Sequence, residues 1–235
     1  MCALLKFGGN GANGGLQNAE FDAARKLMVE TQLQKRGLTD PAVLQAMESV
    51  PRHEFVPPEF RARTYEDAPL PIGEGQTISQ PYIVAAMTAA LRLGPDERLL
   101  EIGTGCGYQA AILARLTKQA FSVEYNAVLA ASAAARLERL GYANVFVHCG
   151  DGTRGLNDFA PFDAILVAAA APAVPAPLLA QMAEGGRMII PVGDAENQDL
   201  QLIERQGQTF RTTLLEACRF VPLLGAYGWK EPPSR

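Results

Sequence analysis

One segment constrains the fold of this chain more than any other. Residues 99–102 form an apolar run with one acid, and Gly103, Gly105 and Gly107 follow at alternate positions. Glycine lets a backbone turn tightly and approach a ligand closely, because it has no Cβ. Residues 109–114 then begin a helical pattern. The segment therefore predicts a loop between a strand end and a helix start, which is where open α/β sheets bind ligands.

The spacing of these glycines excludes one common nucleotide site. A dinucleotide fingerprint, G-x-G-x-x-G, requires a glycine at position 108, where this chain has Tyr108. An NAD-linked oxidoreductase is therefore disfavoured. The pattern Glu101-x-Gly103-x-Gly105-x-Gly107 instead resembles the motif of S-adenosylmethionine (SAM) methyltransferases.

The composition narrows the class of protein. A net charge of −4 and the absence of a Lys/Arg-rich tract argue against a nucleic-acid partner. The most apolar stretch, residues 164–180, is interrupted by Pro172, Pro175 and Pro177, so no membrane span is expected. The four cysteines form no C-x-x-C pair, which predicts no metal site and reduced thiols. With no export signal in view, we expect a cytoplasmic protein.

The chain is expected to consist of a short extension and one domain. Residues 1–18 are rich in Gly and Asn and predict a flexible extension. Residues 19–235 form one methyltransferase-like domain, with a helical, substrate-side segment at 19–80 and a core at 81–235. In the first segment we expect a helix at residues 21–36, ended by Gly37, and a second helix whose cap is Thr39-Asp40-Pro41, with the proline in its first turn. Residues 50–58 contain three prolines and should be extended.

Strands and helices alternate through the rest of the chain. This alternation predicts a doubly wound, mostly parallel, seven-stranded Rossmann-like sheet with a helical flank at the N-terminal side. A C-terminal antiparallel hairpin follows around residues 206–208. The expected strands are 98–102, 121–124, 145–148, 162–167, 187–190, 200–204 and 210–215, with a last piece at 219–223; the expected helices are 108–116, 127–140 and 176–183.

Acids at successive strand ends indicate a nucleoside-type cofactor. Glu124 closes the strand after the glycine loop, in the place where an acid can accept hydrogen bonds from both ribose hydroxyls. Asp151 follows the next strand and could meet an adenine amino group, with Gly152 giving it room. Taken singly, each of these residues is as often a turn or helix-start residue. The glycine loop, Glu124 and Asp151 follow three successive strands, and this shared position favours the cofactor.

A polar segment lies upstream of the glycine loop. Thr77-Ile78-Ser79-Gln80-Pro81 turns into a helix pattern, and a serine there can cap the helix. Taken alone, capping is the simpler explanation of Ser79.

The chain resembles the protein-L-isoaspartate O-methyltransferases from about Phe21 to its end. The shared motifs are Val50-Pro51-Arg52-His53-Glu54-Phe55-Val56-Pro57, Thr77-Ile78-Ser79-Gln80-Pro81, Leu100-Glu101-Ile102-Gly103-Thr104-Gly105-Cys106-Gly107-Tyr108, Gly150-Asp151-Gly152, Pro161-Phe162-Asp163-Ala164-Ile165, Gly185-Gly186-Arg187 and Arg219-Phe220-Val221-Pro222-Leu223. The resemblance implies repair of damaged proteins by methylation of the α-carboxylate of L-isoaspartyl residues. It implies SAM as cofactor and S-adenosyl-L-homocysteine as product.

The resemblance also implies roles for particular residues. Ser79 matches the family's active-site serine, and Thr77, Ile78 and Val221 belong to the segments that meet the substrate peptide. The residues matching cofactor contacts are Glu101, Ile102, Gly103, Thr104, Gly105, Gly107, Glu124, Asp151 and Gly152. Damaged proteins and peptides are the implied partners, and we expect a monomer.

The implied chemistry needs few catalytic groups. An α-carboxylate, with a pKa of about 3.3–3.7, is ionised at pH 7 and needs no general base. It needs placement in line with the methyl–sulfur bond, at roughly 3–3.5 Å. His53 and His148 are therefore expected to be structural.

Two other functions stay open at this point. The chain could methylate an aspartate of a dedicated peptide or a small-molecule carboxylate, or it could be a non-catalytic SAM-binding adaptor. The intact glycine, acid and serine positions argue against the adaptor. Two segments depart from the pattern common among relatives. Many relatives have a basic residue after the acid, where this chain has Tyr125-Asn126-Ala127, and they often have a threonine or glycine within the segment that is Ala168-Ala169-Ala170-Ala171 here.

Overall fold

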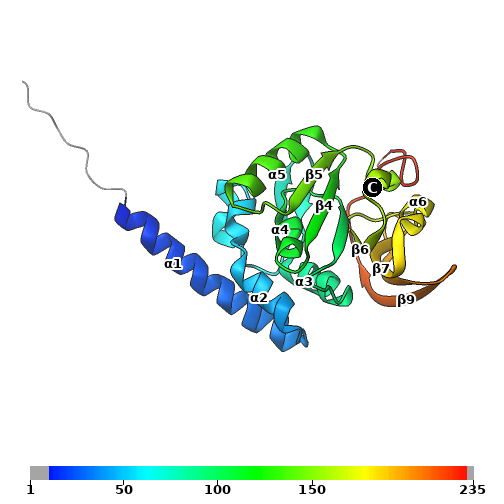
Figure 1. Cartoon of the computed structure of the whole chain (residues 1–235). Coiled ribbons are helices and arrows are strands. Elements are labelled where there is room, and N and C mark those ends of the chain that lie inside the picture. Colours follow the sequence, from blue (N-terminus) through cyan, green and yellow to red (C-terminus); the bar gives the residue numbers. More distant parts are fainter. Residues whose placement is uncertain (1–10, 232–235) are drawn as a thin grey trace, which may run out of the picture.

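The structure, a computed structural model, describes the backbone of residues 11–231 and the side chains of residues 19–231. Its centre is a seven-stranded sheet with strand order β5-β4-β3-β6-β7-β8-β9, flanked by helices (Figure 1). Strands β3 to β7 pair in parallel, and β8 and β9 are antiparallel. This confirms the predicted fold class. The strands are β3 Arg98–Ile102, β4 Gln119–Glu124, β5 Val145–Cys149, β6 Phe162–Val167, β7 Met182–Gly193, β8 Gln198–Gln206 and β9 Thr209–Cys218.

The helices follow the predicted order. They are α1 Gly11–Met28, α2 Pro41–Ser49, α3 Pro81–Ala90, α4 Tyr108–Ala114, α5 Ala127–Arg139 and α6 Ala176–Ala180, and the chain continues from α1 through a π-helical turn, Val29–Leu33. The predicted cap of α2 is confirmed, because the Asp40 carboxylate accepts from the Ala42 N–H at 2.9 Å. No described helix is both long and apolar enough to cross a bilayer.

Several boundaries differ from the prediction. Helix α1 begins at Gly11, ten residues before the predicted start, and it projects from the body in Figure 1. Once a helix is nucleated, each further residue adds one hydrogen bond, so it extends into a segment of modest propensity. Residues 1–10 of the predicted extension lie outside the described part. Residues 50–58 are only partly extended: Val50 and Val56 have extended backbone angles, but 3₁₀ turns form at Arg52–Phe55 and Pro58–Arg63.

Other differences concern short strands. Sequence reasoning missed a two-stranded hairpin, β1 Leu70–Gly73 and β2 Gln76–Ile78, because each strand is only a few residues long. The Gly185-Gly186 segment, predicted as a turn before a strand, lies within β7. The predicted last strand at 219–223 forms only a bridge between Ala170 and Pro222.

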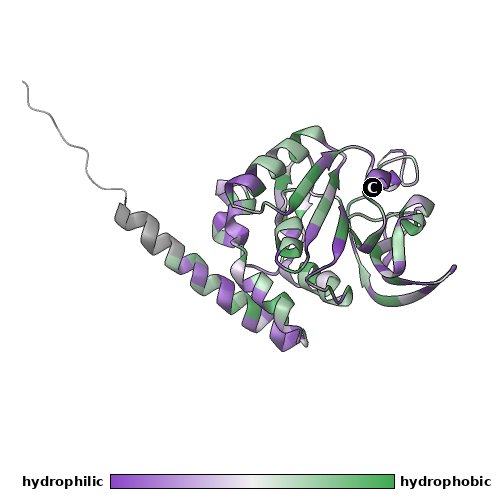
Figure 2. Cartoon of the chain, viewed as in Figure 1, coloured by the Kyte–Doolittle hydropathy of each residue, from purple (hydrophilic) through white to green (hydrophobic). Residues whose placement is uncertain are grey.

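The central strands are buried on both faces, as parallel strands under helices must be. Leu100 and Ile102 of β3 pack with Phe121 and Val123 on one face. Leu99 packs on the other face, against a cluster that includes residues of α3 and α4. In Figure 2 apolar colouring runs along these strands and along the helices that flank them. The sheet is thus a rigid platform that fixes where the loops after each strand emerge.

The chain changes direction at β3. From β3 it runs outward to β4 and β5, and then returns to β6 on the other side of β3. The loops after β3 and β6 therefore diverge, and doubly wound sheets bind ligands in the crevice at this switch point. The Ala168 N–H donates to the Ile102 carbonyl at 2.8 Å, which fixes the two strand ends at that point.

Candidate functional site

The glycine loop leaves β3 in a conformation that other residues resist. Gly103 and Gly105 have φ values of 95° and 55°, which L side chains rarely adopt. The Gly103 N–H donates to the Val123 carbonyl at 2.8 Å, so the loop begins as a continuation of the sheet. Its later backbone groups face a cavity at the switch point.

Glu124 stands at the end of β4, as predicted, and its carboxylate is already oriented. One oxygen, Oε2, accepts from the Gly105 N–H at 2.8 Å, and Oε1 accepts from the Asn126 N–H at 3.0 Å. The side chain is buried but lines the cavity. Each carboxylate oxygen has further lone pairs, so Glu124 can still accept from two ligand hydroxyls.

The cavity beside Glu124 has a volume of about 550 Å³, within the usual range for a small-molecule site. Its walls come from the glycine loop, from the loops after β4 and β6, from the β1–β2 hairpin and from the C-terminal segment. The predicted site residues that line it are Thr77, Ile102, Gly103, Gly105, Glu124, Gly152 and Val221. The structure thus brings together residues from widely separated parts of the chain.

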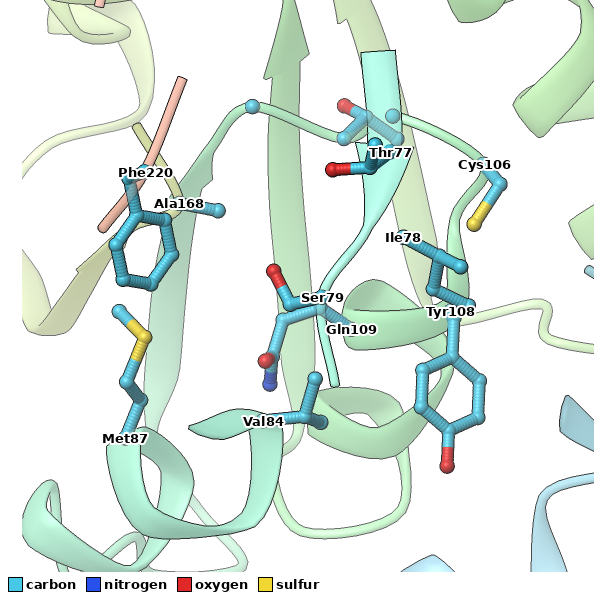
Figure 3. A pocket seen from close by; sticks show the side chains of 13 residues that line it. Thr77, Ile78, Ser79, Val84, Met87, Cys106, Tyr108, Gln109, Ala168 and Phe220 are labelled. Carbon is cyan, nitrogen blue, oxygen red and sulfur yellow. The ribbon is translucent and has the colours of Figure 1, made fainter. Parts of the chain in front are cut away.

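A smaller cavity of about 50 Å³ adjoins the first (Figure 3). The two share Thr77, Gly103, Gly105 and Ala168. Ser79, Ile78 and Thr104 line only the smaller one. A ligand in the large cavity that reaches past the glycine loop would therefore meet Ser79.

Ser79 does not cap helix α3. Gln80 occupies the N-cap position, and no side chain makes a capping hydrogen bond there. The Ser79 hydroxyl thus remains free for the cavity that it lines. The backbone of Ser79 is held instead, since its carbonyl accepts from Arg52 Nη2 at 2.8 Å.

The C-terminal segment closes the large cavity. Ala170 donates to the Val221 carbonyl at 2.8 Å, and Leu223 donates to the Ala170 carbonyl at 2.8 Å. These bonds hold the segment to the loop after β6 as a short strand would. Across the cavity, Asn126 Nδ2 donates to Glu74 Oε2 at 3.1 Å and links the hairpin to the start of α5.

Three predicted contact residues do not line either cavity: Glu101, Gly107 and Asp151. Gly107 is the N-cap of α4 with a φ of 90°, and a Cβ there would stand 3.1 Å from Leu137 Cδ1, so backbone conformation and close packing together explain this glycine. The Asp151 carboxylate accepts from the Thr153 N–H at 3.0 Å and from the Ala226 N–H at 2.9 Å. Asp151 therefore anchors the C-terminal segment, while its neighbour Gly152 faces the cavity.

Glu101 is buried inside the sheet. Its Oε2 accepts from the Ser122 hydroxyl, which also contacts Thr104 Oγ1, and Oε1 has no protein partner among the described residues. Burial raises the pKa of Glu101 to about 8, with a further rise from the Glu124 charge and an opposing effect of the Ser122 bond. The raised pKa favours the neutral, protonated carboxyl group at pH 7.

The raised pKa of Glu101 predicts a pH dependence of stability. The folded state holds this proton up to about pH 8, whereas the unfolded chain loses it near the ordinary pKa of 4.5. The contribution of Glu101 to the free energy of unfolding is therefore fully present below pH 4.5. It falls as the pH rises toward 8, by up to about 1.4 kcal/mol per pH unit. Between pH 5.5 and 7.5, the free energy of unfolding of the parent should fall by up to about 3 kcal/mol more than that of Glu101→Gln. Urea unfolding at the two pH values measures the difference. Equal slopes in the parent and the variant would contradict this, and exposed Glu138→Gln is the control.

Gly152 predicts a second, local effect. A Cβ at this position would lie 2.5 Å from Ile102 Cγ2, whereas at Gly150 nothing lies within 4 Å. We expect Gly152→Ala to lower the free energy of unfolding by about 1–3 kcal/mol, because the buried Ile102 must shift. Denaturant unfolding measures it, and Gly150→Ala is the matched control. If Gly152→Ala were as stable as the control, Ile102 would be able to shift without loss of stability, and the prediction would be wrong.

His53 and Cys106 are buried and have no reactive role. His53 stacks on Phe21 with 4.1 Å between ring centroids, and its Nδ1 bonds the Tyr65 hydroxyl at 2.8 Å. Burial lowers the pKa of His53 and favours the neutral ring. Cys106 lines the smaller cavity, but burial raises the pKa of its thiol, which keeps it protonated and unreactive.

Sequence reasoning missed Gln109, which reaches from α4 toward the part of the smaller cavity where Ser79 lies (Figure 3). The Thr88 hydroxyl donates to the Val84 carbonyl at 2.7 Å, so it can only accept from Gln109 Nε2 at 2.9 Å. The Gln109 amide oxygen thus remains available. The sequence feature that could have identified Gln109 as a site residue is its position directly after Tyr108, at the end of the glycine-loop motif. The β1–β2 hairpin residues Glu74 and Gln76 gave no such signal.

Comparisons with known proteins agree with this geometry. A family model described as protein-L-isoaspartate(D-aspartate) O-methyltransferase (PCMT) matches residues 23–228. A protein-L-isoaspartate O-methyltransferase of Roseiflexus castenholzii is 54% identical over 210 residues, which are 89% of this chain and 96% of that protein.

Two solved structures share the fold. A protein-L-isoaspartate O-methyltransferase superposes with a TM-score of 0.79 at 32% identity, over 87% of this chain and 67% of that one. The putative enzyme of Plasmodium falciparum, in complex with S-adenosyl-L-homocysteine, gives 0.75 at 25% identity, over 85% and 98%. The match of the family model and the extent of these identities establish that this chain belongs to the protein-L-isoaspartate(D-aspartate) O-methyltransferase family.

Proposed function

We propose that this chain transfers the methyl group of SAM to the α-carboxylate of L-isoaspartyl residues in damaged proteins and peptides. The observation behind the proposal is the pair of adjoining cavities. The larger has an oriented Glu124 and a glycine loop, which suit a nucleoside with a charged amino-acid tail, and the smaller has a free Ser79 hydroxyl. The family and the S-adenosyl-L-homocysteine complex of its P. falciparum member support the same cofactor here.

The residues of the large cavity fit this cofactor. Glu124 would accept from the two ribose hydroxyls, and Gly103 and Gly105 would let the amino-acid part pass close to the backbone. Val221 and Leu223 close the cavity from the C-terminal side. Bound SAM supplies an electrophilic methyl on a sulfonium, and transfer leaves S-adenosyl-L-homocysteine and a neutral methyl ester.

On the acceptor side, the chain has to place one carboxylate. The Ser79 hydroxyl can donate to one carboxylate oxygen and leave the other free to attack. Within the lining of the smaller cavity, no side chain is basic, so the attacking oxygen keeps its electron density. Orientation of an already ionised nucleophile is enough to account for methyl transfer without a general base.

Methyl transfer from labelled SAM to matched peptides tests the proposal. The peptides differ only in an L-isoaspartyl or a normal L-aspartyl linkage. We expect transfer to the isoaspartyl peptide alone. Transfer to the aspartyl peptide would indicate a dedicated aspartate acceptor, and SAM binding without transfer to either would indicate an adaptor.

A further inference from the structure

Arg52 is a buried cation with neutral hydrogen-bond partners. Its side chain is 0% exposed. Nε donates to the Thr64 carbonyl and Nη2 to the Ser79 carbonyl, both at 2.8 Å. Nη1 is buried without a partner among the described residues. No ion pair forms between Arg52 and a carboxylate in that part of the chain.

Such an arrangement is costly for stability. Taking a charge out of water without a counter-charge is expensive, and an apolar residue of similar volume is often at least as stable in such a place. The Tyr108 ring, whose centroid is 4.9 Å from Arg52 Cζ, offsets part of this cost. Burial lowers the pKa of Arg52, yet a guanidinium stays charged in proteins. Stability alone therefore does not account for the buried charge, and a role in binding a ligand has to be considered.

The neighbours of Arg52 point to the acceptor cavity. Ser79 and Tyr108, which the guanidinium touches, both line the smaller cavity. Arg52 itself does not line it. The positive charge thus lies directly behind the wall where the acceptor carboxylate is proposed to bind, and charges interact more strongly across a protein interior than across water.

We propose that Arg52 is a positioning residue for the acceptor: it fixes Ser79 through the Ser79 carbonyl, and its buried charge favours an anionic acceptor over a neutral one. This inference rests on the proposed function of Ser79. Because the guanidinium acts from behind the wall, it attracts the carboxylate without occupying the attacking oxygen. Methylation removes the negative charge, so the same device favours release of the ester.

Two substitutions separate the two roles. Arg52→Met removes both the charge and the bond to Ser79, and Arg52→Lys keeps the charge but lacks the planar fork. Arg98→Met is the matched control, since Arg98 also donates to two carbonyls, those of Phe159 and Pro161, and lies over the Phe121 ring. Arg98 begins β3, whereas the site lies at the other end of that strand.

The readouts are thermal unfolding, SAM affinity, kcat and KM for an isoaspartyl peptide, and peptide affinity in the presence of S-adenosyl-L-homocysteine. The last measurement compares the isoaspartyl peptide with its uncharged amide analogue. In Arg52→Met we expect KM to rise at least tenfold and the preference for the acid over the amide to fall at least tenfold. SAM affinity should change less than threefold. Arg52→Lys should retain most of the preference but lose at least tenfold in kcat.

Each other result overturns the inference. An unchanged preference in folded Arg52→Met, with the parent active, would sink it and leave the proposed function standing. A parent without transfer to the isoaspartyl peptide would sink the proposed function itself. If Arg52→Met does not unfold cooperatively, Arg52→Lys decides: an unchanged kcat, or failure of both variants to fold, would assign Arg52 a purely structural role.

Discussion

Replacing Ser79 with alanine is expected to reduce kcat/KM for an isoaspartyl peptide by about 10²-fold, because loss of precise placement of a reactant typically costs that much. The hydroxyl lines the smaller cavity and has no capping role at α3. Its removal should therefore affect acceptor placement and little else. Initial rates with labelled SAM at varied peptide concentration measure the effect.

The specificity of the Ser79 effect can be checked in two ways. SAM affinity should remain within about threefold of the parent, since Ser79 does not line the large cavity. Ser49→Ala is the matched control, because Ser49 donates only to the Ala46 carbonyl within α2. A Ser79→Ala variant with the activity of the control would show that backbone groups place the carboxylate instead.

Replacing Glu124 with glutamine is expected to raise the dissociation constant of SAM by about 10²-fold or more. The carboxylate accepts from the Gly105 and Asn126 N–H groups and should also accept from the ribose. Hydrogen bonds to a charged group contribute about 1.5–3 kcal/mol each. The amide nitrogen of glutamine cannot accept a hydrogen bond. The substitution therefore removes both a bond from the loop backbone and a bond from the ligand. Isothermal titration calorimetry measures the affinity.

The outcome for Glu124→Gln separates ligand binding from folding. Circular dichroism and thermal unfolding should show a folded protein, because glutamine has almost the same volume. Glu138→Gln, an exposed substitution on α5, is the control. If SAM affinity in Glu124→Gln stays within about threefold of the parent, the ribose is held by other groups, and the acid serves only to shape the glycine loop.

Much of the fold follows from local patterns. The β3 and β6 boundaries coincide with the predicted ones, because both strands are apolar runs with clear ends at a glycine or a proline. The Asp40 cap and the Gly37 stop are also local, since each depends on a side chain or a φ value within one turn. Boundaries that depend on packing against distant segments, such as those of β7 and β9, were predicted too short.

The site was predicted unevenly for the same reason. Glu124 and Gly152 could be assigned from their positions at strand ends, because parallel strands bring their carboxyl ends to one edge. Asp151 occupies an equivalent position, yet its carboxylate bonds the Ala226 N–H, from a segment 75 residues away. Glu101 was matched to the cofactor contacts, but its side chain is buried within the predicted strand β3 and accepts from Ser122.

The fold class, the glycine loop, the acid at the end of β4 and the serine segment could all be read from the chain, because they are set by residue type and by spacing over a few residues. The folded arrangement was needed to see that Ser79 does not cap the helix, that Glu101 is buried with a raised pKa, and that Arg52 donates to the Ser79 carbonyl without a counter-charge. Burial and hydrogen-bond partners depend on contacts between segments far apart in the chain. No local pattern specifies those contacts.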